Sequence, residues 1–480
     1  MKESFVFKSF AMALALIMTF SVAGCGDSSN EKSATSDNGF PKVENVYTKD
    51  EVVDLNGYEF VIAADFQYYD DPTNVDMIVS EQVFHQRREE VEEEYNCTIK
   101  IIDVPENFSA KILAGEKVAD IVQLDLCNLM NSIGAGYLRP LDSIEGIDLS
   151  DSRWSHCEKY IELATFKDRP YALSYAIPCE VRGGMAVNNT LLKKLGINED
   201  IPQLVRYKKW NFDKFLEIAQ KCTVDANGDG EPESYGVFSQ SGDKYCTDWI
   251  NANGGRMAVM NSDGKIVENF SDDKIINGLN FASDLANKYN VAYIPEAWRT
   301  KETFLAGGYT QKDFANEFVN GKFAFYMCET WVLNQLVKPI SSDMEYSFVP
   351  MPMGPDTDSY SCDGHYMLGF GITVNNKDLD KATTIINALA KRPEGYEDDE
   401  WIDTAIGIQF FQDGDEDSIE MYNLLYENSN FDYMYGLGDL NALYNNALMP
   451  AVLWNQGTPA TILSSMRGTM QSYLDKVYNK

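Results

Sequence analysis

Residues 58–104 read YEFVIAADFQYYDDPTNVDMIVSEQVFHQRREEVEEEYNCTIKIIDV, and this stretch decides the fold. Residues 58–64 form a short apolar run typical of a strand, and residues 98–104 form a second one. Between them, Phe84 and Tyr95 fall on one face of a helix whose other face carries acidic and basic residues. A strand, a helix and a strand in this order predict a βαβ unit.

The same alternation continues along the chain. A helical pattern at residues 109–115 precedes a third apolar run at 119–124, so we expect parallel strands buried on both faces. Further on, Asn211 is placed to cap a helix, and Thr458 is placed to cap the last helix, on whose buried face we expect Tyr473. The pattern is that of an α/β protein.

Composition excludes several classes of protein. The chain has 480 residues, of which 44% are apolar and 12% aromatic, so it can build large cores and is not a disordered or fibrous protein. Its formal charge is −34, and no cluster of lysine and arginine interrupts the acidic composition. We therefore expect no nucleic-acid partner, because an acidic surface repels phosphate backbones.

The first 24 residues have the features of an export signal. Lys2 and Lys8 precede an apolar run at residues 10–20, which is shorter than the ~20 residues that a membrane-spanning helix needs. Small residues then lead to Cys25, and this ending resembles the lipobox of bacterial lipoproteins. The resemblance implies that Cys25 is lipidated after cleavage and that the protein is anchored to the outer face of the cell membrane.

The segment after the lipidation site is expected to be a flexible tether. Residues 25–52 are rich in serine, asparagine, aspartate and lysine and offer little to bury. Export permits disulfides, but the eight remaining cysteines show no pairing motif, so their disulfide state stays open and buried free thiols are slightly favoured.

Catalytic signatures are missing from the sequence. It contains no phosphate-binding glycine loop, no dinucleotide fingerprint, no G-x-S-x-G and no H-E-x-x-H, and its three histidines lack the spacing of a metal pair. With 74 acidic residues, accidental carboxylate pairs are certain, so glycosidase chemistry can be neither claimed nor dismissed from pairs alone. We expect no catalytic residue and no cofactor apart from a candidate calcium ion.

The calcium candidate is the turn at residues 225–230. Asp225, Asn227 and Asp229 alternate along it and Gly230 ends it, as in the opening of a calcium loop. Gly236 stands where such a loop supplies a bidentate glutamate, so a turn held only by Asx hydrogen bonds is an equally physical interpretation.

Five stretches together resemble one family of proteins, the extracellular solute-binding proteins, family 1, of bacterial ABC sugar importers, a group that includes maltose-binding protein. The stretches are residues 119–142, 169–197, 208–237, 318–336 and 365–390. The resemblance implies an α/β, two-lobed periplasmic-binding-protein fold of type II character, with a hinge and a ligand cleft between the lobes. It also implies a monomer that binds a sugar and contacts ABC permease subunits.

The family pattern places the lobes and the cleft residues on this chain. The first lobe would comprise residues 53–178 and 363–435, and the second lobe residues 179–362 and 436–480, with the first crossing near 175–184. Carried over motif by motif, the ligand-binding residues implied by the resemblance are Asp125, Glu180, Arg182, Tyr245, Trp249, Glu329, Trp331, Asp363 and Tyr366.

The function implied is the binding of a carbohydrate, most simply an oligosaccharide, without turnover. Aromatic faces match the C–H faces of sugar rings, and carboxylates and Arg182 would hydrogen-bond the hydroxyl groups. The acidic candidates keep a peptide or a polyamine open as the ligand. A carbohydrate-active enzyme and a surface adhesin are the competing classes, which turnover and small-molecule stabilisation would separate.

Overall fold

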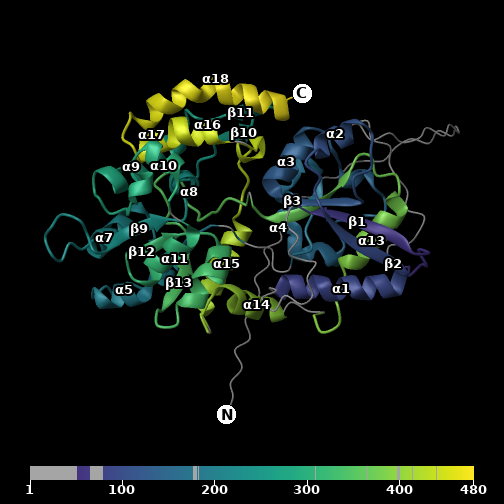
Figure 1. Ribbon diagram of the computed structural model, residues 1–480, viewed down its shortest axis with the longest axis horizontal. Helices are drawn as coiled ribbons and strands as arrows, with labels where there is room; N and C mark the ends of the chain where they lie inside the picture. Colours follow the sequence, from purple (N-terminus) through teal and green to yellow (C-terminus); the bar gives the residue numbers. More distant parts are fainter. Residues whose placement is uncertain are drawn as a thin grey trace, which may run out of the picture. The chain divides into compact units, whose positions relative to one another are not determined.

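The structure is a computed structural model that describes residues 51–64, 79–176, 181, 183–308, 310–364, 366–396, 400–412, 414–438 and 440–479. The predicted export signal, Cys25 and the tether up to residue 50 lie outside the described residues. Two mixed sheets organise the chain from residue 51 onward, each with its own covering helices (Figure 1).

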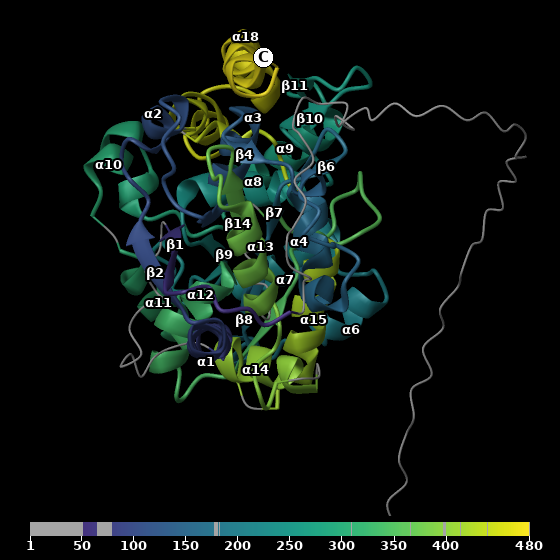
Figure 2. The same ribbon diagram turned by 90° about the vertical axis from the view of Figure 1, so that its right-hand side faces the viewer.

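The first sheet has the strand order β2-β1-β3-β14-β4, with β7 paired to β14. Strand β1 runs parallel to β2 and β3, as the sequence predicts, whereas β14 runs antiparallel to β3, β4 and β7. In Figure 2, β2 and β1 lie on the left and β14 lies beside helix α13. The strands are β1 (Tyr58–Ala64), β2 (Cys97–Asp103), β3 (Ile121–Asp125), β4 (Leu138–Arg139), β7 (Ala172–Leu173) and β14 (Leu368–Thr373).

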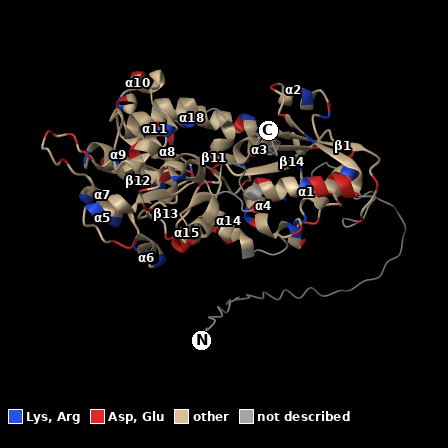
Figure 3. Cartoon of the chain, turned by 60° about the horizontal axis from the view of Figure 1, so that its bottom comes forward, with Lys and Arg blue, Asp and Glu red and all other residues tan. Residues whose placement is uncertain are grey.

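Helix α1 confirms the predicted βαβ unit. Its residues Phe84 and Tyr95 are buried against the sheet, and its glutamates give it the acidic face seen in Figure 3. The helices that contact the first sheet or α1 are α1 (Val79–Tyr95), α3 (Leu126–Gly134), α4 (Glu158–Leu163) and α13 (Leu379–Leu389). Helix α2 (Phe108–Leu113) and the small hairpin of β5 (Thr165–Phe166) and β6 (Arg169–Pro170) complete this lobe.

The second sheet has the order β13-β8-β12-β9. Its strands are β8 (Met185–Asn188), β9 (Tyr235–Ser239), β12 (Phe323–Met327) and β13 (Tyr346–Val349), and β10 (Ala258–Met260) and β11 (Ile266–Glu268) form a separate hairpin. The further helices are α5 (Asn189–Lys194), α6 (Ile201–Arg206), α7 (Phe212–Cys222), α8 (Gly242–Ala252), α9 (Asp273–Asn287), α10 (Lys301–Ala306), α11 (Gln311–Val319), α12 (Thr330–Val332), α14 (Glu400–Phe410), α15 (Glu416–Glu427), α16 (Asn441–Leu443), α17 (Met449–Val452) and α18 (Pro459–Val477).

The predicted helix caps are confirmed. The Asn211 side chain accepts a hydrogen bond from the Lys214 amide at 2.9 Å and caps α7, and the Thr458 hydroxyl accepts from the Thr461 amide and caps α18. These contacts satisfy amide donors that no turn of the helix itself can satisfy.

One predicted lobe boundary is wrong. Within the range 363–435, α13 contacts α1 of the first lobe, but α15 contacts β13 and α6 of the second lobe. Two contacts to Phe348 of β13 hold this part of the chain. The Phe411 ring stacks on the Phe348 ring with a centroid distance of 5.5 Å, and the Ser418 hydroxyl accepts a hydrogen bond from the Phe348 amide. Helices α14 and α15 therefore pack with the second sheet.

Tyr473 is the residue of α18 that the prediction misplaces. It is 39% exposed, whereas Leu463, Met470 and Leu474 are buried.

The described cysteines are free thiols, and all but Cys127 are buried. Burial raises the pKa of the thiols of Cys222 to about 12 and of Cys97 to about 11, so they behave as apolar core residues. Cys179 lies outside the described residues, and its state stays open. Within the part of the chain that is described, no helix is both long and apolar enough to span a membrane.

Candidate binding site between the lobes

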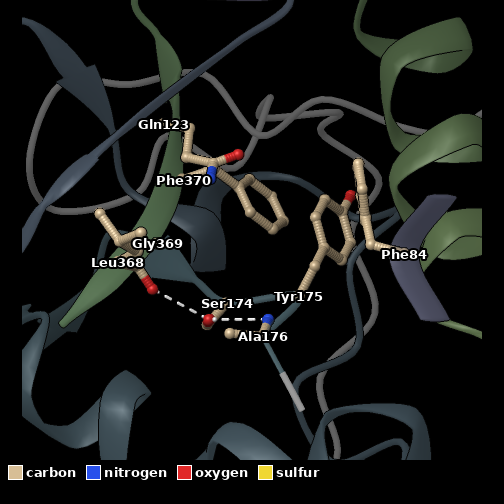
Figure 4. A pocket seen from close by; sticks show the side chains of 8 residues that line it. All are labelled: Phe84, Gln123, Ser174, Tyr175, Ala176, Leu368, Gly369 and Phe370. Atoms are coloured by element: carbon tan, nitrogen blue, oxygen red, sulfur yellow. Dashed lines mark hydrogen bonds between the residues drawn. The ribbon is translucent and has the colours of Figure 1, made fainter. Parts of the chain in front are cut away.

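The chain leaves the first sheet through a fixed anchor after β7. The Tyr175 ring stacks on Phe370 of β14 with a centroid distance of 4.2 Å, and the Ser174 hydroxyl donates to the Leu368 carbonyl at 2.9 Å (Figure 4). A small pocket remains between these side chains and Phe84. The anchor holds the start of the first crossing to the middle of the sheet.

Two later crossing segments are paired with each other. Asp363 and Asn430 form an isolated parallel bridge, in which the Gly364 amide donates to the Asn430 carbonyl at 2.8 Å and the Asn430 amide to the Cys362 carbonyl at 3.1 Å. Because this pair joins the loop before β14 to the segment after α15, Asp363 lies where the two lobes meet.

Tyr366 lies close to acidic side chains from both lobes. Burial raises the pKa of its phenol, and the charges of Glu329, Asp243 and Asp125 raise the pKa further. Asp125 belongs to the first lobe, whereas Glu329 and Asp243 belong to the second. These residues therefore lie within electrostatic range of the same phenol.

Asp125 stands at the end of β3, where that strand passes directly into α3. Its carboxylate caps the helix by accepting from the Asn128 amide at 2.8 Å, and it is 8% exposed. Two residues on, Cys127 has a pKa raised well above its usual value by burial and by the charges of Asp125, Asp363 and Glu329. The carboxyl end of a parallel strand is a common place for a ligand in an α/β lobe.

Glu329 and Trp331 follow the last residues of β12. The Glu329 amide donates to the Gln240 side chain at 2.8 Å, and the Trp331 indole nitrogen donates to the Glu329 carboxylate. Glu329 is 4% exposed and Trp331 is half-buried. Part of the indole ring is therefore accessible to a ligand, while its N–H is fixed by the hydrogen bond to Glu329.

Several further side chains near this place are not predicted from the sequence. Lys244 and Asp248 on α8 are ion-paired at 3.0 Å, and Tyr435 and Tyr444 lie near Asp363. Burial raises the pKa of both tyrosines, and the charge of Asp363 raises it further. No motif marks these four residues, because they come from helix interiors and from the last crossing.

Both π-helical segments in the described part of the chain border these residues. One, Leu333–Val337, begins two residues after Trp331, and the other, Tyr444–Leu448, begins at Tyr444. Such wide turns are frequent at functional sites, because they displace a side chain from its regular position. They mark the same region as the acidic and aromatic residues.

Two predicted ligand residues are corrected to core residues. Tyr245 is buried and its hydroxyl donates to the Ala282 carbonyl at 3.0 Å. Trp249 is buried among Phe212, Phe215 and Phe281, with ring centroids 5.1 to 5.5 Å apart. Both point into the interior of the second lobe, because α8 is buried along nearly its whole length. Glu180 and Arg182 lie outside the described residues.

The calcium candidate is an exposed turn tied by its own hydrogen bonds. The Asp225 carboxylate accepts from the amides of Gly228 and Gly230, and Asn227 accepts from the Asp229 amide at 2.8 Å. Among the described residues, no three histidine, cysteine or acidic side chains are placed to share a metal ion. The Asx turns account for the pattern Asp225, Asn227, Asp229, and calcium stays a prediction.

The assembled site is suited to binding. Five of the nine predicted residues meet there, namely Asp125, Glu329, Trp331, Asp363 and Tyr366, and they come from both lobes and from a crossing segment. Carboxylates and phenols can hydrogen-bond hydroxyl groups, and the indole and phenol rings can cover an apolar face.

The two sheets with their covering helices, and the paired segments that cross between them, make a two-lobed α/β fold. Residues 81–395 match the family of bacterial extracellular solute-binding proteins, and the chain belongs to this family. An extracytoplasmic location follows from the family. No curated protein sequence matches the chain.

Solved structures show the same fold at low sequence identity. A maltose/maltodextrin-binding domain from Bdellovibrio bacteriovorus bound to maltotriose is 14% identical, with a TM-score of 0.54 over 88% of this chain and 100% of that one. An ABC substrate-binding protein from Listeria monocytogenes in complex with cycloalternan is 14% identical, with a TM-score of 0.56 over 88% and 99%. A solute-binding protein from Thermotoga lettingae bound with tagatose is 14% identical, with a TM-score of 0.55 over 87% and 100%.

Proposed function

We propose that this chain is the lipid-anchored substrate-binding protein of an ABC importer and that it binds a carbohydrate, specifically an oligosaccharide, between its lobes. It acts as a monomer, performs no reaction on its ligand and delivers it unaltered to the permease. The observation that carries this proposal is the meeting of Asp125 from the first lobe with Glu329 and Trp331 from the second lobe around Tyr366.

The physical basis is a shift between open and closed states. A ligand that contacts both half-sites binds the closed state better than the open one, and it moves the population by its difference in affinity. Tyr366 and Trp331 supply ring surface, while Asp125, Glu329 and Asp363 supply directional acceptors. A sugar with a misplaced hydroxyl leaves one of these buried acceptors unpaired, at a cost of about 1 to 3 kcal/mol.

The charge of the site favours neutral or cationic ligands. Four carboxylates, Asp125, Asp243, Glu329 and Asp363, influence the tyrosines and Cys127 of the site, against one described buried ammonium, Lys244. An anionic sugar would add a further negative charge to this group. The same excess supports a polyamine or a basic peptide as the second candidate ligand.

A thermal-stability screen tests the proposal. Purified protein is heated with maltotriose, maltotetraose, cycloalternan, galacturonic acid, spermidine and a tri-lysine peptide. A ligand present at 100 times its Kd stabilises the native state by about 2.7 kcal/mol. We expect stabilisation by a neutral oligosaccharide, none by the uronate, and recovery of the sugar intact. Stabilisation by spermidine or the peptide alone would overturn the carbohydrate assignment, and released product would overturn the assignment as a binding protein.

Matched variants test the site. Trp331→Ala should lose the stabilisation by the bound sugar, whereas Tyr473→Ala, which removes an exposed ring from α18, should keep it. Equal ligand responses in both variants would show that the ligand lies elsewhere. The anchor is tested separately by metabolic labelling with palmitate, which should be lost in Cys25→Ser.

A further inference from the structure

Gln240 stands at the edge of the second sheet from which Glu329 and Trp331 also emerge. Strands β9 and β12 are parallel neighbours (Figure 1), and their last residues, Ser239 and Met327, are paired. The Gln240 amide donates to the Met327 carbonyl at 3.0 Å, so the chain after β9 stays against the chain after β12. Gln240 therefore lies at the carboxyl ends of parallel strands, where α/β lobes commonly hold ligands.

One hydrogen bond sets the orientation of the Gln240 carboxamide. Its side-chain oxygen accepts from the Glu329 amide at 2.8 Å, and only the oxygen can accept, so the side-chain nitrogen faces the other way. The Gln240 backbone is held as well, because its carbonyl accepts from the Gln311 side chain at 2.8 Å. Groups of the second lobe thus fix both the backbone and the side-chain oxygen of Gln240.

The side-chain nitrogen of Gln240 remains a free donor. In the part of the chain that the structure describes, no group accepts a hydrogen bond from this nitrogen, although Gln240 is only 7% exposed. The nitrogen itself keeps some contact with solvent, so a small molecule can reach it. Since most donors of buried residues are paired, this oriented nitrogen is suited to pair with a ligand.

We propose that Gln240 is a ligand-contacting residue: its side-chain nitrogen donates to a hydroxyl oxygen of the bound sugar, while its side-chain oxygen holds the backbone of Glu329. The carboxylates of the site, Asp125, Glu329 and Asp363, accept hydrogen bonds but cannot donate them. A sugar hydroxyl can donate one hydrogen bond and accept another, so a neutral donor complements these acceptors. The ammonium groups of a polyamine cannot accept from Gln240. The sugar contact rests on the proposed function, whereas the free donor does not.

Two substitutions separate the nitrogen from the oxygen. Gln240→Glu keeps an oxygen for the Glu329 amide and removes the donor, whereas Gln240→Met removes both without adding a charge. Each should weaken maltotriose binding about tenfold in isothermal titration calorimetry, the loss expected for one hydrogen bond. Full affinity in Gln240→Glu would show that only the oxygen matters, and full affinity in Gln240→Met would assign the loss to the added charge. Either result overturns the proposal.

Gln412 is the matched control. Its side-chain oxygen also accepts from a strand amide, that of Tyr346, at 3.0 Å, but its side-chain nitrogen donates to the Met344 carbonyl at 2.8 Å. Gln412→Glu and Gln412→Met should therefore keep the maltotriose affinity within twofold of the wild type. A loss as large as that of the Gln240 variants would mean that any such change in the second lobe weakens binding, and the contact would be refuted.

A series of monodeoxy maltotrioses identifies the hydroxyl group. The wild type should bind one analogue about tenfold more weakly than maltotriose, whereas Gln240→Glu should bind that analogue and maltotriose within twofold of each other, because the hydrogen bond is already absent. Equal losses in both proteins for every analogue overturn the contact alone. A wild type that binds spermidine and no maltotriose overturns the carbohydrate assignment and the contact together.

Discussion

The last described turn of the chain provides a sharp test of the packing. Tyr478 follows α18, which packs on β11 of the second lobe, yet its ring lies 5.7 Å from Phe166 of the first lobe and 5.6 Å from Tyr433. The side chain is 2% exposed, and Gly134 of α3 packs directly against it. A Tyr478→Ala variant therefore leaves a cavity between elements of both lobes.

The expected loss follows from this burial. Truncating a fully buried aromatic ring to alanine costs about 3 to 5 kcal/mol, which includes the cavity that remains. The two ring contacts contribute about 0.5 to 1.5 kcal/mol each to that loss. Tyr473→Ala, on the same helix but 39% exposed, should cost less than about 1 kcal/mol. The quantity to measure is the difference between the losses in unfolding free energy of the two alanine variants.

Urea unfolding followed by far-ultraviolet circular dichroism gives both values. The described residues, from 51 onward, belong to one compact unit, so we expect a single transition whose slope is the same for each variant. Tyr478→Phe is the internal control: the Tyr478 hydroxyl has no hydrogen-bond partner in the described chain, so removing it should cost nothing. A loss for Tyr478→Ala as small as that for Tyr473→Ala would refute the packing described here.

Three further predictions concern one carboxyl group and two glycines. Burial, and next the charge of Asp363, raises the pKa of Asp432 from 3.8 to about 6. The folded state therefore binds this proton more tightly, and the free energy of unfolding should fall by about 3 kcal/mol as the pH rises from about 3 to about 7. Subtracting the unfolding profile of Asp432→Asn isolates this fall, and a flat difference would contradict it. Gly468→Ala in α18 meets no atom within 4 Å and should stabilise by about 0.5 to 1 kcal/mol, seen as a higher melting temperature. Gly369→Ala in β14 places a Cβ 2.2 Å from Tyr160 and should lower the melting temperature, at a cost of about 1 to 3 kcal/mol.

Local patterns in the sequence predict the fold well where the structure of an element depends on residues close to it along the chain. The βαβ unit at 58–104 and the caps at Asn211 and Thr458 are confirmed, because strand alternation, helix faces and capping depend on neighbours in sequence. The pairing of β14 with β3 and the packing of α15 on β13 depend on contacts more than 50 residues away along the chain. The predicted assignment of α14 and α15 to the first lobe is wrong for this reason.

In the candidate site, too, some residues can be predicted from the sequence and others cannot. Family motifs place Asp125 and Trp331 close after buried strands, and in the structure they follow β3 and β12. Their role in binding a ligand stays a prediction. The aromatic residues of α8 belong to the core, which the sequence does not reveal because their neighbours are polar although nearly all of α8 is buried. Lys244 is missed because an isolated lysine beside other charges looks like a surface residue until burial is known.

Each half of the site has contacts within its own lobe. The Asp125 carboxylate accepts from the first turn of α3, and the Glu329 amide donates to Gln240 while its carboxylate accepts from Trp331. Opening at the crossings can separate the two halves while these bonds stay intact. In the proposed function, closure then draws its free energy from the ligand that bridges both halves. A ligand that reaches only Trp331 and Glu329 should bind without closing the lobes, and small-angle scattering with a monosaccharide and with its trisaccharide would separate the two cases.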